Sequence, residues 1–135
     1  MSYSISEIEG IGPVYAEKLG AVGIKTTEAY LERAKDPKGR KALADETSIE
    51  ASRILKWANM ADLMRISGVG EEYSELLEAA GVDTVKELKH RNAENLAAKM
   101  SEVNVEKKLV RQVPGTTQVT KWVEQAKELP AMMSY

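Results

Sequence analysis

Two glycine turns are the residues of this sequence with the clearest capacity for chemistry. Gly10-Ile11-Gly12 and Gly68-Val69-Gly70 each interrupt an otherwise apolar and charged helical pattern. Glycine inside a helix costs about 1 kcal/mol relative to alanine, so some backbone feature must require it. A tight turn with positive φ, followed by a helix whose first N–H groups are free, would explain both glycines. Such a helix start suits a phosphate, because free amides and the positive end of the helix dipole both face the anion.

Residues for catalysis or metal binding are scarce. The chain contains no cysteine, and its single histidine, His90, stands between Lys89 and Arg91. The sequence offers no zinc ligand set, no Ser/His/Asp set and no glycine-rich loop followed by Lys-Ser or Lys-Thr. Its many acidic residues are spread along helix surfaces. We therefore expect a protein without enzymatic activity, metal or cofactor.

Length and charge allow several kinds of partner. The 135 residues, 43% of them hydrophobic, suffice for one ordinary domain or two very small ones. With 19 basic against 21 acidic residues, the chain has no strong overall field for nucleic acid. No basic start leads into an apolar run, and no stretch approaches the roughly 18 apolar residues of a membrane span. We expect a soluble, cytoplasmic protein.

An internal repeat surrounds the two turns. Residues 8–27 align without a gap with residues 66–85, at an offset of 58. Nine of the 20 positions are identical: Ile8/Ile66, Gly10/Gly68, Gly12/Gly70, Tyr15/Tyr73, Glu17/Glu75, Leu19/Leu77, Ala21/Ala79, Gly23/Gly81 and Thr26/Thr84. A looser match pairs Trp57 with Trp122, and we expect both side chains to pack in the core. The chain is predicted to consist of two related halves, 1–62 and 63–135.

The elements that must position the turns are all helical. Apolar spacing and breakers predict about ten helices or helical turns and no strands. A long helix from about Ile49 to Gly68 is expected to join the two halves, and Thr84 to Glu87 is expected to form a capping box. The other helices are expected over Pro13–Leu19, from the cap Thr26 to Arg33, over Pro37–Glu46, from the cap Asn92, and from Thr116 or Thr117 to Pro130.

Both turns resemble the helix-hairpin-helix family. The first copy of its pattern is Ile5, Ile8, Gly10, Ile11, Gly12, Ala16 and Leu19, and the second is Leu63, Ile66, Gly68, Val69, Gly70, Ser74 and Leu77. Nearly the whole chain also resembles a bacterial family of unknown function built from a duplicated unit of this kind. The resemblance implies an all-α fold of two tandem hairpin units and contact with the DNA backbone that does not depend on base sequence. Carried over by position, the contacting amides lie around Gly10, Ile11, Gly12 and Val14, and around Gly68, Val69, Gly70 and Glu72. In this family the hairpin carbonyls sometimes also hold a monovalent cation.

The charges depart from the family pattern. Where the family often has a basic residue, two places after the second glycine, this chain has Val14 and Glu72. Glu71 and Glu72 would repel a phosphate from the second turn. The neutral first turn is the better candidate.

Basic residues gather elsewhere and leave two functions open. One group, Lys35, Lys38, Arg40 and Lys41, is a candidate DNA contact, although such runs are often only solvated surfaces. Two further groups are Lys86, Lys89 and Arg91, and Lys107, Lys108 and Arg111. The leading hypothesis is a module that binds the duplex DNA backbone, and the alternative is a protein-interaction scaffold. The C-terminal "LPAMMSY" could dock on the core or meet a partner.

Overall fold

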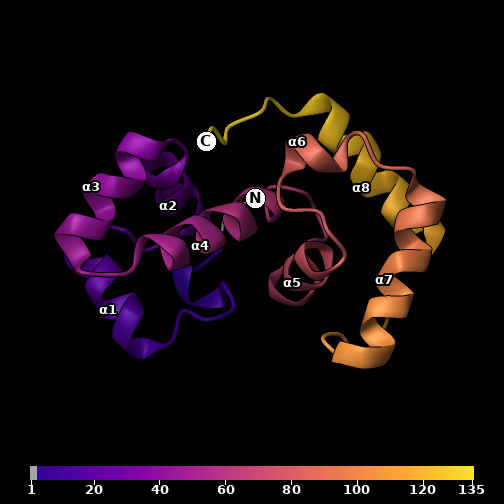
Figure 1. The fold of residues 1–135 in the computed structure, drawn as a ribbon, viewed down its shortest axis with the longest axis horizontal. Coiled ribbons are helices and arrows are strands. Elements are labelled where there is room, and N and C mark those ends of the chain that lie inside the picture. Colours follow the sequence, from indigo (N-terminus) through magenta and orange to yellow (C-terminus); the bar gives the residue numbers. More distant parts are fainter. Residues whose placement is uncertain (1–2) are drawn as a thin grey trace.

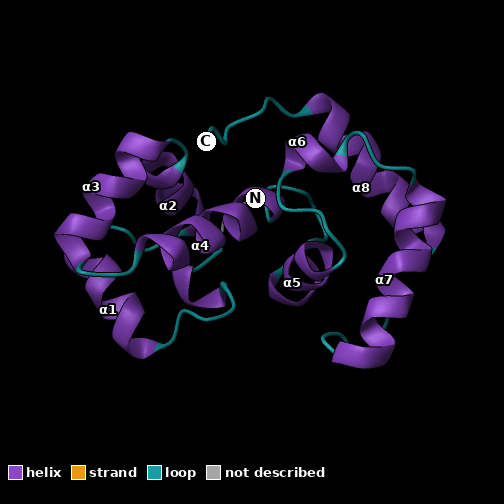
Figure 2. Ribbon diagram, viewed as in Figure 1, coloured by secondary structure: helices purple, strands orange, loops and turns teal. Residues whose placement is uncertain are grey.

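The computed structural model describes residues 3–135, which form eight α-helices and one turn of 3₁₀-helix (Figures 1 and 2). In this range the only β-type pairing is an isolated bridge between Ser4 and Thr26. The prediction of an all-α fold is confirmed. The elements are η1 (Ile5–Glu7), α1 (Pro13–Ala21), α2 (Thr27–Ala34), α3 (Pro37–Thr47), α4 (Ala51–Leu63), α5 (Glu71–Ala79), α6 (Val85–Leu88), α7 (Ala93–Lys107) and α8 (Thr116–Glu128).

Three helices begin where local capping predicts. Thr26 Oγ1 accepts from the N–H of Ala29 at 3.1 Å at the start of α2. Asp36 Oδ1 accepts from the N–H of Gly39 at 2.7 Å, and Asn92 Oδ1 accepts from the N–H of Asn95 at 3.0 Å. Each cap satisfies a donor that the first turn of a helix leaves free. These starts are confirmed.

The expected capping box at Thr84 is wrong. The Thr84 side chain makes no capping hydrogen bond, and Glu87 instead accepts from the N–H of Asp83 at 3.2 Å. The cap of α6 comes from the end of α4, where Asp62 Oδ2 accepts from the N–H of Val85 at 2.8 Å. A residue 23 positions away therefore replaces the local cap.

The expected long helix from Ile49 to Gly68 is also wrong. α4 starts at Ala51 and ends at Leu63, and the chain then turns through short-range hydrogen bonds. The N–H of Ile66 donates to Leu63 O at 3.1 Å, and Gly68 has φ +92°. This linking turn brings Leu63 and Ile66 into contact with the helices that follow.

The buried apolar side chains form two clusters that meet at this link. The first lies among η1 and α1 to α4, with Trp57 2% exposed; the second lies among α5 to α8, with Trp122 1% exposed. Both tryptophans are core residues, as predicted. Ala61 and Met64 belong to the first cluster, whereas Leu63 belongs to the second. The predicted division at residue 62 falls in the last turn of α4, just before this link, and stays a prediction.

The C-terminal segment returns to the first half. After α8 the chain crosses to the side of α2 (Figure 1), where Met133 is buried in the first cluster. The N–H of Ser134 donates to Lys35 O at 2.8 Å, and the Tyr135 hydroxyl bonds to Asn59 Oδ1 at 2.7 Å. Of the two possibilities that the sequence left open, the structure shows docking on the core.

Candidate nucleic-acid interface

The two glycine turns have matching backbones. Gly10 has φ +97° and Gly68 has φ +92°, values that side chains other than glycine rarely adopt. A Cβ on Gly10 would lie 3.1 Å from Trp57 Nε1, and one on Gly68 would lie 3.3 Å from Trp122 Nε1. In both halves the first glycine is therefore required twice, by its φ angle and by the indole packed against it.

The middle residue of each turn serves the fold rather than a ligand. The N–H of Ile11 donates to Ile8 O at 3.0 Å, and the N–H of Val69 donates to Ile66 O at 3.1 Å. Both side chains are buried in the cores. Because these amides already have acceptors, we remove Ile11 and Val69 from the candidate phosphate contacts. The sequence alone could not predict these hydrogen bonds, because it does not distinguish a free backbone amide from one that has an acceptor.

The free donors lie one step further along the chain. Gly12 is the N-cap of α1, and within residues 3–135 the N–H groups of Gly12, Val14 and Tyr15 donate to no acceptor. Pro13, at the first helical position, has no N–H to offer. Val14 is 66% exposed, so the start of α1 is open to solvent. It is an uncharged, accessible helix terminus of the kind that binds anions.

A cation missed by the sequence analysis lies beside this terminus. The guanidinium carbon of Arg53, in α4, lies 5.4 Å from the centre of the Tyr15 ring. Tyr15 in turn packs edge-on against Trp57, with ring centroids 5.1 Å apart. The stack connects α4 to the first turn of α1 and places a positive charge near its free amides. Nothing in the spacing of the sequence joins Arg53 to Tyr15, because the contact arises from the packing of α4.

The second turn is surrounded by carboxyl groups. Glu71 and Glu72 open α5, and Glu9 reaches them from the first half. A hydrogen bond with the Glu9 carboxyl, then partial burial, then the charges of Glu9, Glu72 and Glu7 raise the pKa of Glu71 to about 7. Burial and the charge of Glu9 also raise the pKa of Glu75. These groups favour a proton over a second anion, so this helix start is unsuited to phosphate.

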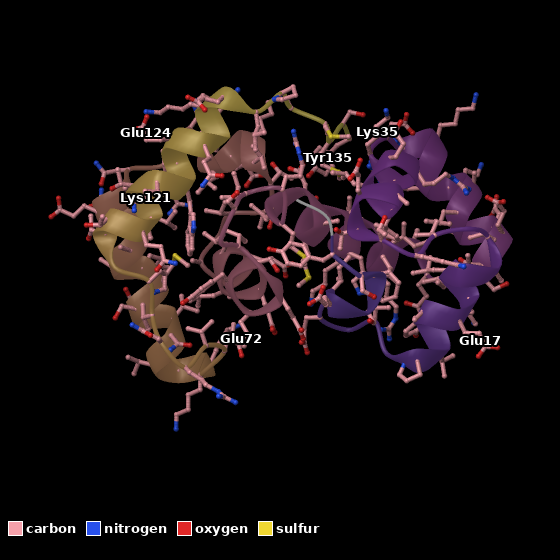
Figure 3. All side chains as sticks on the ribbon, turned by 180° about the vertical axis from the view of Figure 1, so that it is seen from behind. Glu17, Lys35, Glu72, Lys121, Glu124 and Tyr135 are labelled. Atoms are coloured by element: carbon pink, nitrogen blue, oxygen red, sulfur yellow. The ribbon has the colours of Figure 1, made fainter. Side chains whose placement is uncertain are left out.

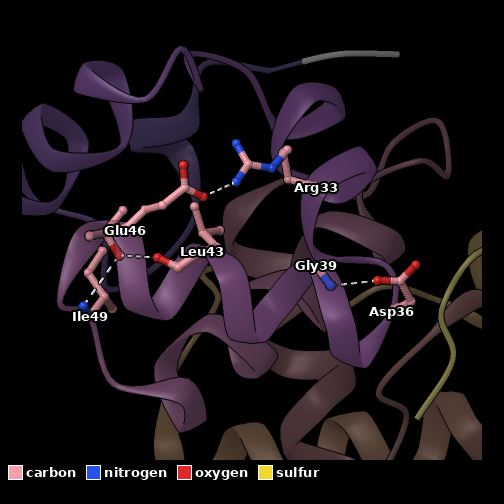
Figure 4. A network of polar contacts seen from close by, with 7 residues as sticks. Arg33, Asp36, Gly39, Leu43, Glu46 and Ile49 are labelled. Atoms are coloured by element: carbon pink, nitrogen blue, oxygen red, sulfur yellow. Dashed lines mark hydrogen bonds and ion pairs between the residues drawn. The ribbon is translucent and has the colours of Figure 1, made fainter.

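The basic stretch 35–41 comprises the two-residue connection between α2 and α3 and the first residues of α3 (Figure 4). Asp36 caps α3, and a Cβ on Gly39 would lie 2.0 Å from the carbonyl oxygen of Arg33, so only glycine fits there. Arg33 also pairs with Glu46 across α2 and α3. The residues that bring the lysines together are thus needed for the tight connection itself.

The prediction of Arg40 as a candidate DNA contact is wrong. It is 8% exposed, and its guanidinium donates to Ala34 O at 2.9 Å and to Ser134 O at 2.7 Å. Its guanidinium carbon lies 5.5 Å from the centre of the Tyr135 ring. Arg40 therefore holds the C-terminal segment and does not face a ligand. Its partner at position 134 lies 94 residues away, which no local pattern reveals.

The lysines of this group do not lie beside the first turn. Lys38 and Lys41 are exposed, and Lys35 pairs with Glu32 at 2.8 Å. In Figure 3, Lys35 lies near Tyr135 at the top of the view, whereas Glu17 of α1 lies at the bottom. The candidate contacts thus fall into two separate places, the open start of α1 and an exposed lysine pair near the start of α3.

The described chain shows no centre for metal chemistry. Among residues 3–135 no three His, Asp or Glu side chains are grouped so that they could hold a metal ion. In the same range no helix is both long and apolar enough to cross a bilayer.

Comparison with known proteins places the chain in one family. Residues 9–129 match the model of a domain of unknown function, DUF4332. No curated protein and no solved structure matches the chain. The matched range covers both glycine turns and all eight helices, so the chain belongs to the family defined by this domain of unknown function.

Proposed function

We propose that this protein is a non-enzymatic binding module of two tandem helix-hairpin-helix units that contacts the phosphate backbone of duplex DNA through its first turn. Equivalent hydrogen bonds in the two halves support the tandem arrangement. The N–H of Ala16 donates to Gly12 O at 2.9 Å, and the N–H of Ser74 donates to Gly70 O at the same distance. The ring of Tyr15 packs on Trp57 as that of Tyr73 packs on Trp122, with centroids 5.1 and 5.2 Å apart.

The open start of α1 is the observation that carries the DNA proposal. Three free N–H groups, on Gly12, Val14 and Tyr15, meet solvent at the positive end of a nine-residue helix. Arg53 adds a cation over the Tyr15 ring, at the edge of this surface. These groups contact phosphate oxygens rather than base edges, so the binding does not depend on base sequence. With so few charges, it is weak and salt-dependent.

Fluorescence anisotropy with a labelled DNA duplex tests the proposal. We expect saturable binding at low salt that weakens as salt rises, with each neutralised phosphate adding about 0.9 to the slope of log K against log salt. Arg53→Gln should weaken binding several-fold and reduce this slope by about 1. The matched control is Lys38→Gln, which removes an exposed cation at the start of α3.

Two results would overturn this assignment. Absence of binding at tens of micromolar protein removes DNA as the partner. A larger loss with Lys38→Gln than with Arg53→Gln places the contact at the start of α3 and not at the start of α1.

The second candidate function is a protein-interaction scaffold. The carboxyl groups of Glu9, Glu71 and Glu72 around the second turn favour it, because they offer a basic protein segment a cluster of acceptors. Affinity capture after nuclease treatment separates the two functions. Recovery of a stoichiometric protein partner, lost with Glu71→Gln and Glu72→Gln together, would favour the scaffold; DNA binding without such a partner would reject it.

A further inference from the structure

A groove of about 700 Å³ lies beside the second turn, on the side of α8. Ser67 and Gly68 line it from the link between the halves, and Thr117, Lys121 and Trp122 line it from α8. Its remaining lining residues are neutral, and no carboxylate is among them. The groove is therefore separate in charge from the start of α5, although both adjoin the same turn.

The start of α8 supplies free donors to this groove. Gly115 is its N-cap and provides no side-chain cap. Within residues 3–135 the N–H groups of Thr116, Thr117 and Gln118 donate to no acceptor. The positive end of a 13-residue helix thus opens onto the groove.

A donor without a protein partner lines the same groove. Trp122 is 1% exposed as a residue, and its indole N–H donates to no acceptor in the described chain. Its Nε1 atom faces Gly68, at 3.3 Å from the position that a Cβ would take there. Because this atom is not among the buried polar atoms that lack a partner, its N–H reaches solvent at the groove, and a ligand oxygen can accept from it in place of water.

Lys121 gives the groove its net charge. It is exposed on α8 (Figure 3), and no carboxylate of the described chain lies within ion-pair distance of its ammonium group. The groove thus combines helix amides, an indole N–H and an ammonium group, all of them donors. A tetrahedral oxyanion, with several acceptor oxygens and a negative charge, complements this set.

In the first half, the start of α4 corresponds to the start of α8, and a carboxylate there disfavours an anion. Trp57 faces Gly10 there as Trp122 faces Gly68. However, Glu50 is the N-cap of α4 where α8 has Gly115. The start of α8 therefore lacks a carboxylate that its counterpart carries.

We infer that the groove between Ser67–Gly68 and the start of α8 binds a phosphate group, which accepts from the amides of α8 and from Trp122 Nε1 and is paired with Lys121. This site is independent of the DNA contact proposed for the start of α1. It uses a different helix and a different turn, and its ligand group is phosphate, either free or in a nucleic acid backbone.

The two indole N–H signals of the intact protein test the inference directly. A ¹H–¹⁵N correlation spectrum contains one signal from Trp57 and one from Trp122, and Trp57→Phe assigns them. On titration with sodium phosphate, against sodium chloride at matched ionic strength, the Trp122 signal should shift with saturation while the Trp57 signal stays in place. Absence of a saturable shift at Trp122 both with phosphate and with a DNA duplex, or equal shifts of both signals, would overturn the inference.

Substitutions at the groove sharpen this result. Gly115→Glu restores the carboxylate that the first half carries; nothing lies within 4 Å of a Cβ there, so the fold accepts it. We expect it to weaken phosphate binding about tenfold or more, and Lys121→Gln to weaken it about fivefold. Gly115→Ala is the matched control and should leave binding within about twofold. Equal affinity of Gly115→Glu and Gly115→Ala would contradict the site.

A second titration with a short DNA duplex separates the sources of phosphate. A Trp122 shift with both probes assigns the groove to phosphate as such, and a shift with DNA alone assigns it to backbone phosphate. No shift with either probe rejects the groove. Because Trp57 lies beside the first turn, a DNA shift at its signal reports the separate contact at α1, so the two proposals can fail independently.

Discussion

The turns at Gly10 and Gly68 have nearly the same backbone and very different surroundings. Each places a glycine with φ above +90° against a buried indole, and each starts a nine-residue helix with free amides. The first helix then presents Pro13 and Val14, whereas the second presents Glu71 and Glu72. Core packing thus fixes the backbone conformation of both turns, whereas the charges on their surfaces differ. Finding the turn establishes how the chain folds, and only its neighbours indicate what it can bind.

The largest expected effect concerns the ends of α4 and α8. Asp62, at the end of α4, is 1% exposed and accepts from Arg65 and from the N–H of Val85, both at 2.8 Å. Asp62→Ala leaves both donors without their acceptor and should lower the free energy of unfolding by about 3 kcal/mol. Urea denaturation measures this loss.

Lys127→Ala provides the matched control at the corresponding place in α8. Lys127 is exposed and pairs only with Glu124, at 3.5 Å, so its removal should cost at most about 0.5 kcal/mol. Equal losses of unfolding free energy in Asp62→Ala and Lys127→Ala would show that the hydrogen bonds of Asp62 to Arg65 and Val85 add nothing to stability.

An intermediate effect tests whether the two turns are equivalent. Gly10→Ala and Gly68→Ala each force a side chain into a left-handed backbone against an indole, which should cost about 2 kcal/mol. Gly12→Ala and Gly70→Ala, where a Cβ meets nothing within 4 Å, should cost about 0.5 kcal/mol. Thermal denaturation of the four variants gives the comparison. A loss confined to one half would break the equivalence of the turns.

The smallest effect distinguishes the acidic turn from the neutral one. The hydrogen bond with Glu9 and partial burial raise the pKa of Glu71 to about 7, so the folded state holds this proton more tightly than the unfolded chain does. The resulting stability is fully present below the ordinary pKa of a glutamate and is lost as pH rises through about 7. Stability measured from pH 5 to pH 8 should therefore fall less in Glu71→Gln than in the wild-type protein. Glu9→Gln, which removes the partner carboxylate, should flatten the same interval, and an unchanged pH profile in both variants would contradict the coupling.

The sequence predicted those features that depend on near neighbours. The caps Thr26, Asp36 and Asn92 each bond to an amide three residues ahead, so a short window contains both partners. The two glycine turns were found in the same way, because a repeat at fixed spacing preserves their local pattern.

Features that depend on distant partners could not be predicted. Asp62 caps a helix 23 residues away, and Arg40 binds a carbonyl 94 residues away. Arg53 reaches the first turn only because α4 packs beside it. The sequence of a basic run such as 35–41 does not distinguish a ligand-binding surface from a structural connection between helices. Here the burial of Arg40 shows that this residue has a structural role.

Exchanging the charges at the two turns tests the central claim most directly. Val14 and Glu72 occupy equivalent positions, and both are exposed, so Val14→Glu and Glu72→Val change charge with little effect on the core. We expect Val14→Glu to weaken duplex DNA binding about tenfold, because it places a carboxylate at the open start of α1, and Glu72→Val to leave binding equal or stronger. Anisotropy titrations of both variants at one low salt concentration measure this. Unchanged binding in Val14→Glu would contradict the account.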